Sequence, residues 1–538
     1  MKNTLTTLCF LALSHAAAAD DKADQAPTLK AIMVGSETSA IDENQSGIVL
    51  QDITLPGKAE ALTARLQPFL GQEITPETPT QVKQEISAYY TEANQPFLLV
   101  QIPEQDVTTG KVRYVIMEGH VGDILYTGNK WFSSELLGRY LHVKSGDKID
   151  EPQLLNDVAS MNRNPFHFTE VVLQPGDKKG KTDIELMTQE HFPLRVFGGA
   201  DNTGNPFTGN SRYFAGFNWG NALFQDDLLT YQFTTADNYK RFWSHFGSYT
   251  SFFSWGHSLF LYGGYSEIHP HIRNFSSEGK SYQGSLRYNM PLKPYYKSVR
   301  QEVGVGADIK GMNSSLFFSD LTGSIPVSAH LSNLSQLVLS YGLQQSSPRN
   351  KLNLSLEFFA SPVLWMANQN KERFNEIRPH ALPRYFYSRL NTADNWTLPH
   401  KFVLAANLRL QGATMPLMPS EQFGLGGYNS VRGYDEHAFN ADLALCANVE
   451  LRMPTIKVFK CSNALTFLAF LDYGVGHNFK NDFHGVSSTE HLLGIGPGVR
   501  YEIYPYLSLR ADYGFKFHKF ENSGPSSGKF HFSATASY

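Results

Sequence analysis

LSLRADYGFKF, residues 507–517, alternates between apolar and polar side chains at every position. One face carries Leu, Ala, Tyr and Phe, and the other carries Ser, Arg, Asp, Gly and Lys. A period of two residues indicates a β-strand whose two faces meet different surroundings. The last stretch of the chain, FHFSATASY at 530–538, repeats the pattern and ends on Tyr538. An aromatic residue there is typical of the girdle in which a closing strand meets a membrane interface.

The same alternation recurs along residues 193–538. LTYQFT at 229–234 and LNLSLEF at 352–358 both interleave apolar with polar side chains, and helical periodicity is absent. A soluble sandwich also alternates, but its polar face points outward to water. The N-terminus of the chain helps to decide between the two arrangements.

Residues 1–19 predict a secretory signal peptide. Lys2 precedes an apolar run at 5–13, and an alanine-rich end leads to Asp20, which places cleavage near Ala19. Beyond this peptide no run approaches the roughly 18 apolar residues that a spanning helix needs. The mature protein is therefore expected to be exported, and it can enter a membrane only as a barrel.

Length and aromatic content favour a transmembrane antiparallel β-barrel. Strands of about 9–11 residues joined by short turns and longer loops would give about sixteen strands across residues 192–538. We expect apolar side chains to face lipid and polar ones to line a lumen. The composition agrees, because only 18% of residues are charged, 13% are aromatic and 43 are glycine, against about 25% charged and 7% glycine in soluble domains. The formal net charge of −4 argues against a nucleic-acid partner.

Three cysteines occur, and Cys9 leaves with the signal peptide. An oxidising compartment would permit a disulfide between Cys446 and Cys461. A hairpin that reverses between Pro454 and Ser462 need not bring the two face to face, and a bridge requires close Cα atoms. We expect two small apolar fillers instead.

Residues 46–191 contain one small α+β pattern twice. The first copy, 46–120, shows the order strand, helix, helix, strand, strand, and the second copy, 121–191, repeats it. Residues 20–45 are polar and mixed, with no clear amphipathic period. Tandem copies of one module form an array, and arrays usually bind polypeptide.

Several motifs then point to a known family. They are Pro103-Glu104-Gln105, Gly110 and Val115-Ile116-Met117-Glu118-Gly119 in the first module, Asn162-Arg163-Asn164-Pro165 in the second, and Asp201-Asn202-Thr203-Gly204-Asn205 with Thr208-Gly209 at the start of the barrel. Over nearly the whole mature chain the sequence resembles the outer-membrane transporters of two-partner secretion, the haemolysin secretion/activation (TpsB) type. The resemblance implies two periplasmic POTRA domains ahead of a 16-stranded barrel. Family members commonly carry an N-terminal plug helix and a long linker, for which residues 20–45 are short.

The resemblance also implies a function for the glycine-rich loop at 412–440. In this family a Val-Arg-Gly-Tyr loop, here 431–434, folds back into the barrel. Its arginine meets the acidic residue of a Phe-x-Asp-x-Gly motif, here Phe470-Leu471-Asp472-Tyr473-Gly474. The implied site residues are Val431, Arg432, Gly433, Tyr434, Phe470, Asp472 and Gly474.

An Arg432–Asp472 salt bridge would tether the loop across the pore, with glycines supplying unusual backbone angles. We expect the pair to be partly solvated, so that its net worth to stability is small. The alternative is an extracellular turn with a solvated Arg432 beside Asp435.

No catalytic, metal or cofactor site is expected. GPSSG at 524–528 matches the G-x-S-x-G hydrolase elbow, but that elbow needs a helix directly after it and a later Asp and His, whereas residues 530–538 form the last strand. His269 and His271 have no third ligand near them in the sequence. No acidic cluster has calcium-loop spacing. An enzyme is therefore the least expected class.

The resemblance implies an outer-membrane pore that works as a monomer in lipid. An exported partner with an N-terminal secretion domain, haemolysin-like or adhesin-like, would be captured by the POTRA domains in the periplasm and passed outward without ATP. Capture by β-augmentation would tolerate varied cargo sequence. One alternative is a factor that inserts other barrels, against which the presence of only two modules counts. Another is a solute-diffusion porin, which leaves residues 46–191 without a purpose.

Overall fold

The computed structural model describes residues 27–36, 45–93, 95, 98–178, 180–205, 208–272, 275–292, 298–320, 323–362, 365–458, 462–480, 487–520, 523 and 526–538. The expected signal peptide and Cys461 lie outside these ranges. Cys446 is a buried free thiol. None of the helices in these ranges is long and apolar enough to span a membrane.

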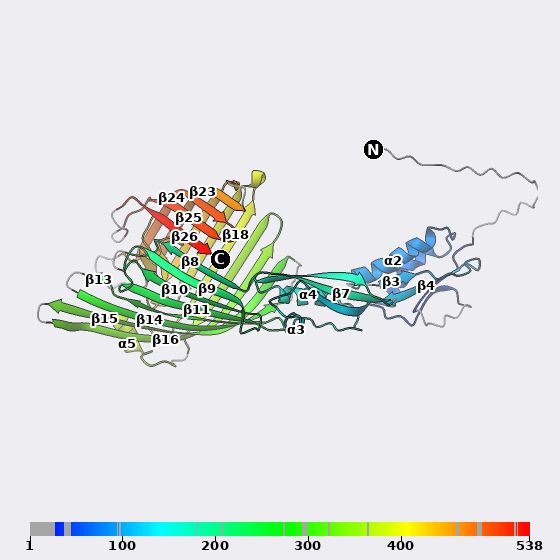
Figure 1. The fold of residues 1–538 in the computed structure, drawn as a ribbon, viewed down its shortest axis with the longest axis horizontal. Coiled ribbons are helices and arrows are strands. Elements are labelled where there is room, and N and C mark those ends of the chain that lie inside the picture. Colours follow the sequence, from blue (N-terminus) through cyan, green and yellow to red (C-terminus); the bar gives the residue numbers. More distant parts are fainter. Residues whose placement is uncertain are drawn as a thin grey trace, which may run out of the picture. The chain divides into compact units, whose positions relative to one another are not determined.

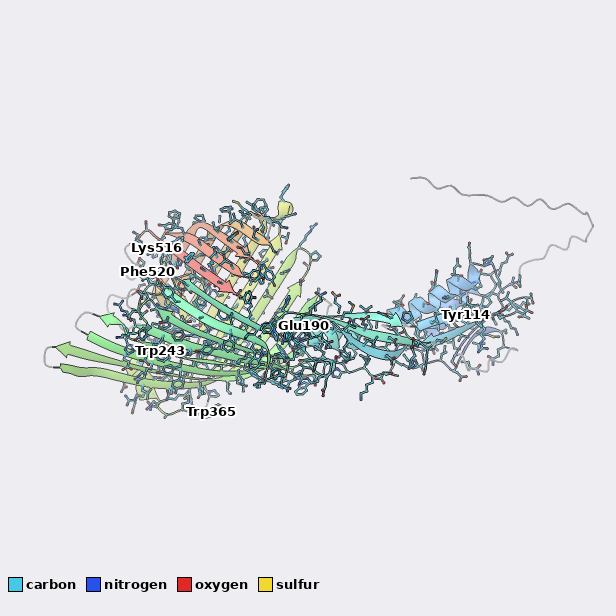
Figure 2. All side chains as sticks on the ribbon, in the orientation of Figure 1. Tyr114, Glu190, Trp243, Trp365, Lys516 and Phe520 are labelled. Carbon is cyan, nitrogen blue, oxygen red and sulfur yellow. The ribbon has the colours of Figure 1, made fainter. Side chains whose placement is uncertain are left out.

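The first α+β module is a four-stranded sheet covered by two helices (Figure 1). Its core joins buried side chains of the helices, such as Leu62 and Ile86, to strand residues such as Val112 and Tyr114. Tyr114, labelled in Figure 2, is fully buried, and its hydroxyl has no hydrogen-bond partner among the described residues. The elements are β1 (Ala31–Gly35), β2 (Gly47–Gln51), α1 (Ala59–Leu66), η1 (Gln67–Phe69), α2 (Thr78–Glu92), β3 (Leu98–Gln101) and β4 (Lys111–Glu118), and the sheet order is β2-β1-β4-β3.

Strand β1 comes from outside the predicted range 46–120. All five of its residues are buried, and it runs parallel to β2 on one side and to β4 on the other. A central strand covered on both faces reads as a continuous apolar run without a period. This explains why residues 20–45 gave no amphipathic signal although 31–35 contribute to the core.

The second module contains β5 (His120–Thr127), α3 (Ser134–Gly138), α4 (Glu151–Met161), β6 (His167–Pro175) and β7 (Lys181–Glu190), with the sheet order β5-β7-β6. Ser133 caps α3 by accepting a hydrogen bond from the N–H of Leu136. The Glu190 carboxylate, labelled in Figure 2, accepts backbone N–H bonds from residues 130, 131 and 132. This charge fixes the turn that leads into α3.

The C-terminal part is a closed antiparallel barrel of sixteen strands, as the alternation predicted. β26 pairs with β8 and closes it. β14, β15 and β16 are the longest strands and project beyond their neighbours (Figure 1). The strands are β8 (Leu194–Asp201), β9 (Arg212–Ala222), β10 (Asp227–Ala236), β11 (Phe242–Phe252), β12 (Ser258–Ile268), β14 (Phe275–Leu292), β15 (Val299–Asp320), β16 (Gly323–Ser346), β17 (Asn350–Ala360), β18 (Phe386–Thr397), β19 (Val403–Ala413), β22 (Leu443–Arg452), β23 (Asn463–His477), β24 (Thr489–Ile503), β25 (Leu507–Lys516) and β26 (Gly528–Ser537), and the short β13 (His271–Ile272) adds to β14.

The two faces of the strands differ as expected. On β25 the Tyr513 and Phe515 side chains are exposed on the outer surface, whereas Asp512 is buried inside the barrel. On β15 Ile309 is 45% exposed and the adjacent Asp308 only 2%. Charged side chains therefore gather in the interior, where a segment of chain can bind them.

Residues 414–442, between β19 and β22, fold back into the barrel, and we call them the lumenal segment. They form a hairpin of β20 (Phe423–Leu425) and β21 (Phe439–Ala441) with a two-stranded sheet of its own. The hairpin contacts β23, and its apolar side chains pack against the wall in a cluster that includes Leu425, Val431 and Leu492. The segment is thus held by packing as well as by polar contacts.

Candidate functional site: a buried arginine inside the barrel

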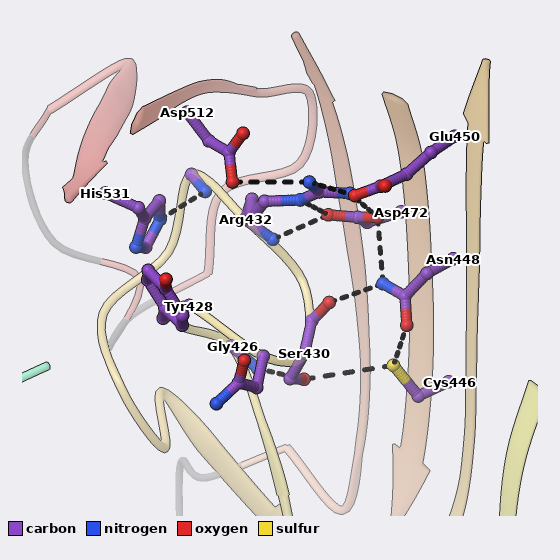
Figure 3. Close-up of polar contacts among 12 residues, drawn as sticks. Gly426, Tyr428, Ser430, Arg432, Cys446, Asn448, Glu450, Asp472, Asp512 and His531 are labelled. Carbon is purple, nitrogen blue, oxygen red and sulfur yellow. Dashed lines mark hydrogen bonds and ion pairs between the residues drawn. The ribbon is translucent and has the colours of Figure 1, made fainter. Parts of the chain in front are cut away.

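Arg432 lies at the tip of the lumenal segment and is only 3% exposed. Its guanidinium grips Asp472 of β23 with two hydrogen bonds, Nε to Oδ2 at 2.7 Å and Nη2 to Oδ1 at 2.9 Å (Figure 3). The backbone N–H of Arg432 donates to the same carboxylate at 3.0 Å. Such a fork is a strong and directional contact, because both partners are charged and planar.

Two further carboxylates lie near the remaining nitrogen of Arg432. Nη1 donates to Glu450 Oε1 on β22 at 2.7 Å and lies 3.4 Å from Asp512 Oδ2 on β25. The guanidinium also lies over the ring of Phe470, with Cζ 3.5 Å from the ring centre. One side chain therefore joins three strands of the wall.

The carboxylates have other cations as well. Arg452 binds Glu450 at 2.7 Å, and both Arg500 and Arg510 bind Asp512, at 2.7 and 2.8 Å. Asp472 and Asp512 are fully buried in their side chains. The expectation of a partly solvated pair is wrong, because the hairpin covers the charges from the lumenal side. Removing one partner from a buried pair is far more costly than the pair's net contribution suggests.

Backbone groups of the segment are held on either side of Arg432. Asn448 donates to the carbonyl of Ser430 at 2.6 Å and to Asp472 Oδ1 at 2.8 Å. The N–H of Gly433 donates to His531 Nε2 at 3.0 Å (Figure 3). The hydroxyl of Tyr434 lies 2.7 Å from the carbonyl oxygen of His518.

Glycines of the wall make room for this backbone. A Cβ on Gly494 would lie 2.0 Å from the carbonyl oxygen of Arg432, and one on Gly514 would lie 2.4 Å from the nitrogen of Gly433. Gly474, the last residue of the Phe-x-Asp-x-Gly motif, leaves space for Val431 in the same way. Gly433 itself has φ +99°, a conformation that favours glycine.

The structure brings together every site residue that the resemblance implied. Asp435, the alternative partner, binds Lys529 at 2.7 Å instead of Arg432. Sequence reasoning missed Glu450, Asp512, Asn448 and His531. Asp512 had a signal, since it lies on the polar face of 507–517, but a single strand does not reveal which strands are its neighbours.

The Asn162-Arg163-Asn164-Pro165 motif meets the turn between β9 and β10. Asn164 Nδ2, Tyr140 Oη and His167 Nε2 all contact the fully buried carboxylate of Asp226, at 2.8, 2.6 and 2.9 Å. Burial, and after it the Asp226 charge, raise the pKa of Tyr140, so its hydroxyl stays a donor. Leu223, Phe224 and Asp226 have φ of 54°, 58° and 63°, a strained turn for residues with a Cβ.

Two other motifs support strand pairing with side-chain amides. Gln105 bonds to both the N–H and the carbonyl of Arg113 on β4, at 2.7 and 3.0 Å. Asn202, just after β8, donates to the carbonyl of Phe530 at 2.7 Å and accepts from the N–H of Phe532 at 2.8 Å. The second pair of contacts lengthens the seam between β8 and β26.

One group of described residues has the donor set for a metal ion. The fold places Glu267 and Glu278 beside His269, with one ligand atom of each within 4.8 Å of the others. Sequence reasoning overlooked Glu267, two residues before His269, and could not place Glu278, which comes from the neighbouring strand β14. Lys280 already pairs with Glu278, and His269 Nε2 lies 2.8 Å from Glu267.

Comparisons with known proteins place these features in a family. Residues 180–501 match the family of the haemolysin secretion/activation protein ShlB/FhaC/HecB, and residues 44–119 match the ShlB-type POTRA domain. The chain is 22% identical to the heme/hemopexin transporter protein HuxB of Haemophilus influenzae, over 86% of this chain and 80% of that protein. The structure resembles CdiB from Escherichia coli, with a TM-score of 0.74 at 14% identity, covering 97% and 93% of the two chains. It also resembles CdiB from Acinetobacter baumannii, with a TM-score of 0.61 at 18% identity, covering 96% and 91%.

The family match spans more than half of the chain and includes the barrel and the Arg432 site. The first POTRA module is matched separately, at residues 44–119. This chain belongs to the haemolysin secretion/activation proteins of the ShlB/FhaC/HecB family, outer-membrane transporters that export a partner protein.

Proposed function

We propose that the secreted partner passes through the barrel lumen, and that the lumenal segment closes this path until Arg432 leaves Asp472. The observation that carries the proposal is the burial of Arg432 among Glu450, Asp472 and Asp512 on three different strands. A segment fixed to one wall at its tip can block a pore and can also be released as a unit.

The charge arrangement suits a segment that has to leave and return. When Arg432 departs, Asp512 keeps Arg500 and Arg510, and Glu450 keeps Arg452. Asp472 keeps the amide of Asn448. The wall therefore avoids the full penalty of an isolated buried charge. The glycines of the wall present no side chains that would interlock with the moving backbone.

We infer that the first POTRA module captures the partner in the periplasm. Its outer strands, β2 and β3, each pair with one neighbour in the sheet order β2-β1-β4-β3. An extended chain can add to such an edge through main-chain hydrogen bonds that tolerate varied sequence. The transporter acts as a monomeric pore in outer-membrane lipid, without ATP, and folding of the partner outside supplies the direction. No side chain is assigned a catalytic role.

The experiment compares culture supernatants and outer-membrane proteins of cells with and without this gene. Loss of one large protein from the medium, with its retention or degradation in the periplasm and normal levels of other barrels, is the expected result. Depletion of many barrels with an unchanged supernatant would overturn the proposal in favour of barrel insertion. No change in either fraction would instead favour a solute pore.

A further inference from the structure

The lumenal segment is held at its base as well as at its tip. Glu421, four residues beyond Leu417, is fully buried and accepts hydrogen bonds from Lys310 of β15 at 2.9 Å and from Tyr387 of β18 at 2.5 Å. Gln336 of β16 donates to it at 3.2 Å. The base is thus fixed to a different part of the wall from the strands that bind Arg432.

A second contact at the base comes from residues 365–385, which precede β18 and which we call the clasp loop. The loop contains α5 (Lys371–Ile377), which lies beside β16 (Figure 1). Asn370 caps this helix by accepting a hydrogen bond from the N–H of Arg373 at 2.9 Å. Phe374 of α5 is fully buried in a cluster with Leu417 and Met418 of the lumenal segment.

Arg378, directly after α5, joins the clasp loop to both ends of the lumenal segment. Its two terminal nitrogens bind the two oxygens of Asp442, each at 2.6 Å, and Nη1 also donates to the carbonyl of Leu417 at 2.6 Å. Asp442 is fully buried and accepts the N–H of Leu417 at 2.9 Å. A bidentate pair of this kind fixes orientation as well as distance.

The clasp loop is itself anchored to the wall. The side-chain amide of Gln369 accepts from the N–H of Ser335 at 3.1 Å and donates to the carbonyl of Ser335 at 3.2 Å. β17 pairs with β16 only from Leu337 onward, so this amide continues the ladder along an edge that β17 leaves open. These bonds hold the clasp loop against β16 and so fix the position of Arg378.

The geometry points to a second latch, Arg378 with Asp442, which holds the base of the lumenal segment independently of Arg432 and Asp472. This inference rests on the proposed function and deepens it, because the pore opens fully only when both latches are released. Arg378 is a positioning residue: it acts on the path by fixing the segment that closes it. Release of the tip alone leaves the segment inside the barrel, tied at Leu417 and Asp442.

The test measures single-channel conductance of the purified full chain in planar lipid bilayers. Four variants are compared with the unsubstituted chain: Arg378→Ala, Arg432→Ala, the two combined, and Arg373→Ala as the matched control. Arg373 lies on α5, the helix that directly precedes Arg378, and pairs with Glu376 at an exposed position. We expect each latch variant to raise the fraction of time spent open by about tenfold, within the range usual for coupling between sites. The combined variant should exceed either one, and Arg373→Ala should change nothing.

Asp442→Asn, which keeps the size of the side chain, provides a second disruption should Arg378→Ala lower the yield of folded barrel. Arg378→Lys keeps the positive charge but cannot bind both oxygens of Asp442 at once, so this variant should close the pore more often than Arg378→Ala and less often than the unsubstituted chain. Unchanged gating in both Arg378→Ala and Asp442→Asn would overturn the second latch, as would a combined variant no more open than Arg432→Ala. Failure of the second latch can be distinguished from failure of the proposed function. The conductance test uses the purified chain without a secreted partner, whereas the secretion experiment compares cells with and without the gene.

Discussion

Gly494→Ala should open the pore without removing any charged group. A Cβ at this position would lie 2.0 Å from the carbonyl oxygen of Arg432, whereas Cβ contacts below 3.0 Å essentially do not occur. The segment must therefore retreat by at least about 1 Å, as overpacking forces a backbone shift. Gly494 pairs with Asp472 across the strands, so the retreat lengthens hydrogen bonds that are now 2.7 to 3.0 Å long.

The size of the effect depends on the burial of the pair. Breaking a buried pair costs about 3 to 5 kcal/mol, but in this variant Arg432 and its partners all remain and only move apart. We therefore expect a smaller cost of about 1.4 kcal/mol, which corresponds to a roughly tenfold shift toward the released segment and does not exceed the effect of Arg432→Ala. Bilayer conductance should show more frequent opening, and limited trypsin digestion should cut at Arg432.

Gly247→Ala is the matched control for Gly494→Ala. It lies in barrel strand β11, and the nearest atom to its added Cβ would be 3.8 Å away. Both variants should insert equally well, since alanine suits a strand at least as well as glycine. If the two variants show the same open fraction in bilayers and the same resistance to trypsin, the close contact between Gly494 and the lumenal segment is not what keeps the pore closed.

Three other predictions concern different parts of the chain. Arg432→Ala should weaken export while barrel levels in the outer membrane stay normal, because the released segment loses the bidentate contact that returns it to its place on the wall. Normal export, measured by immunoblot at normal barrel levels, would contradict this prediction. Burial raises the pKa of Tyr114 above the usual 10.0, so its contribution to the free energy of unfolding is full below pH 10 and falls as pH rises further. Tyr114→Phe should flatten that fall and add about 1 kcal/mol to the free energy of unfolding by removing a buried hydroxyl without a partner. Hydrogen exchange of β4 in the full chain would measure both effects, and a steeper fall with pH would contradict them. Asp226→Ala should speed exchange of the amides of Asn164, Phe166 and His167 more than Tyr140→Phe does, because it leaves three buried donors without their acceptor. Equal effects would show that Asp226 does not organise the cluster.

Strand periodicity, together with the export signal and the length of the chain, predicted the barrel. Stretches such as 507–517 show a two-residue period because one face of each strand meets lipid and the other meets the interior. Neighbouring residues in the sequence therefore carry this signal. Length then set the number of strands near sixteen. A central strand such as β1 left no such trace, because both of its faces are buried and the period vanishes.

The order of the modules, the barrel and the two motifs that contain Arg432 and Asp472 can all be read from the sequence. The surroundings of that pair depend on the tertiary fold. Burial under the hairpin, the approach of Glu450 and Asp512, and the grip of Arg378 on Asp442 all join residues that are far apart in the chain. Register between strands and the path of a folded-back segment are set by packing over the whole barrel, so no local pattern of side chains encodes them.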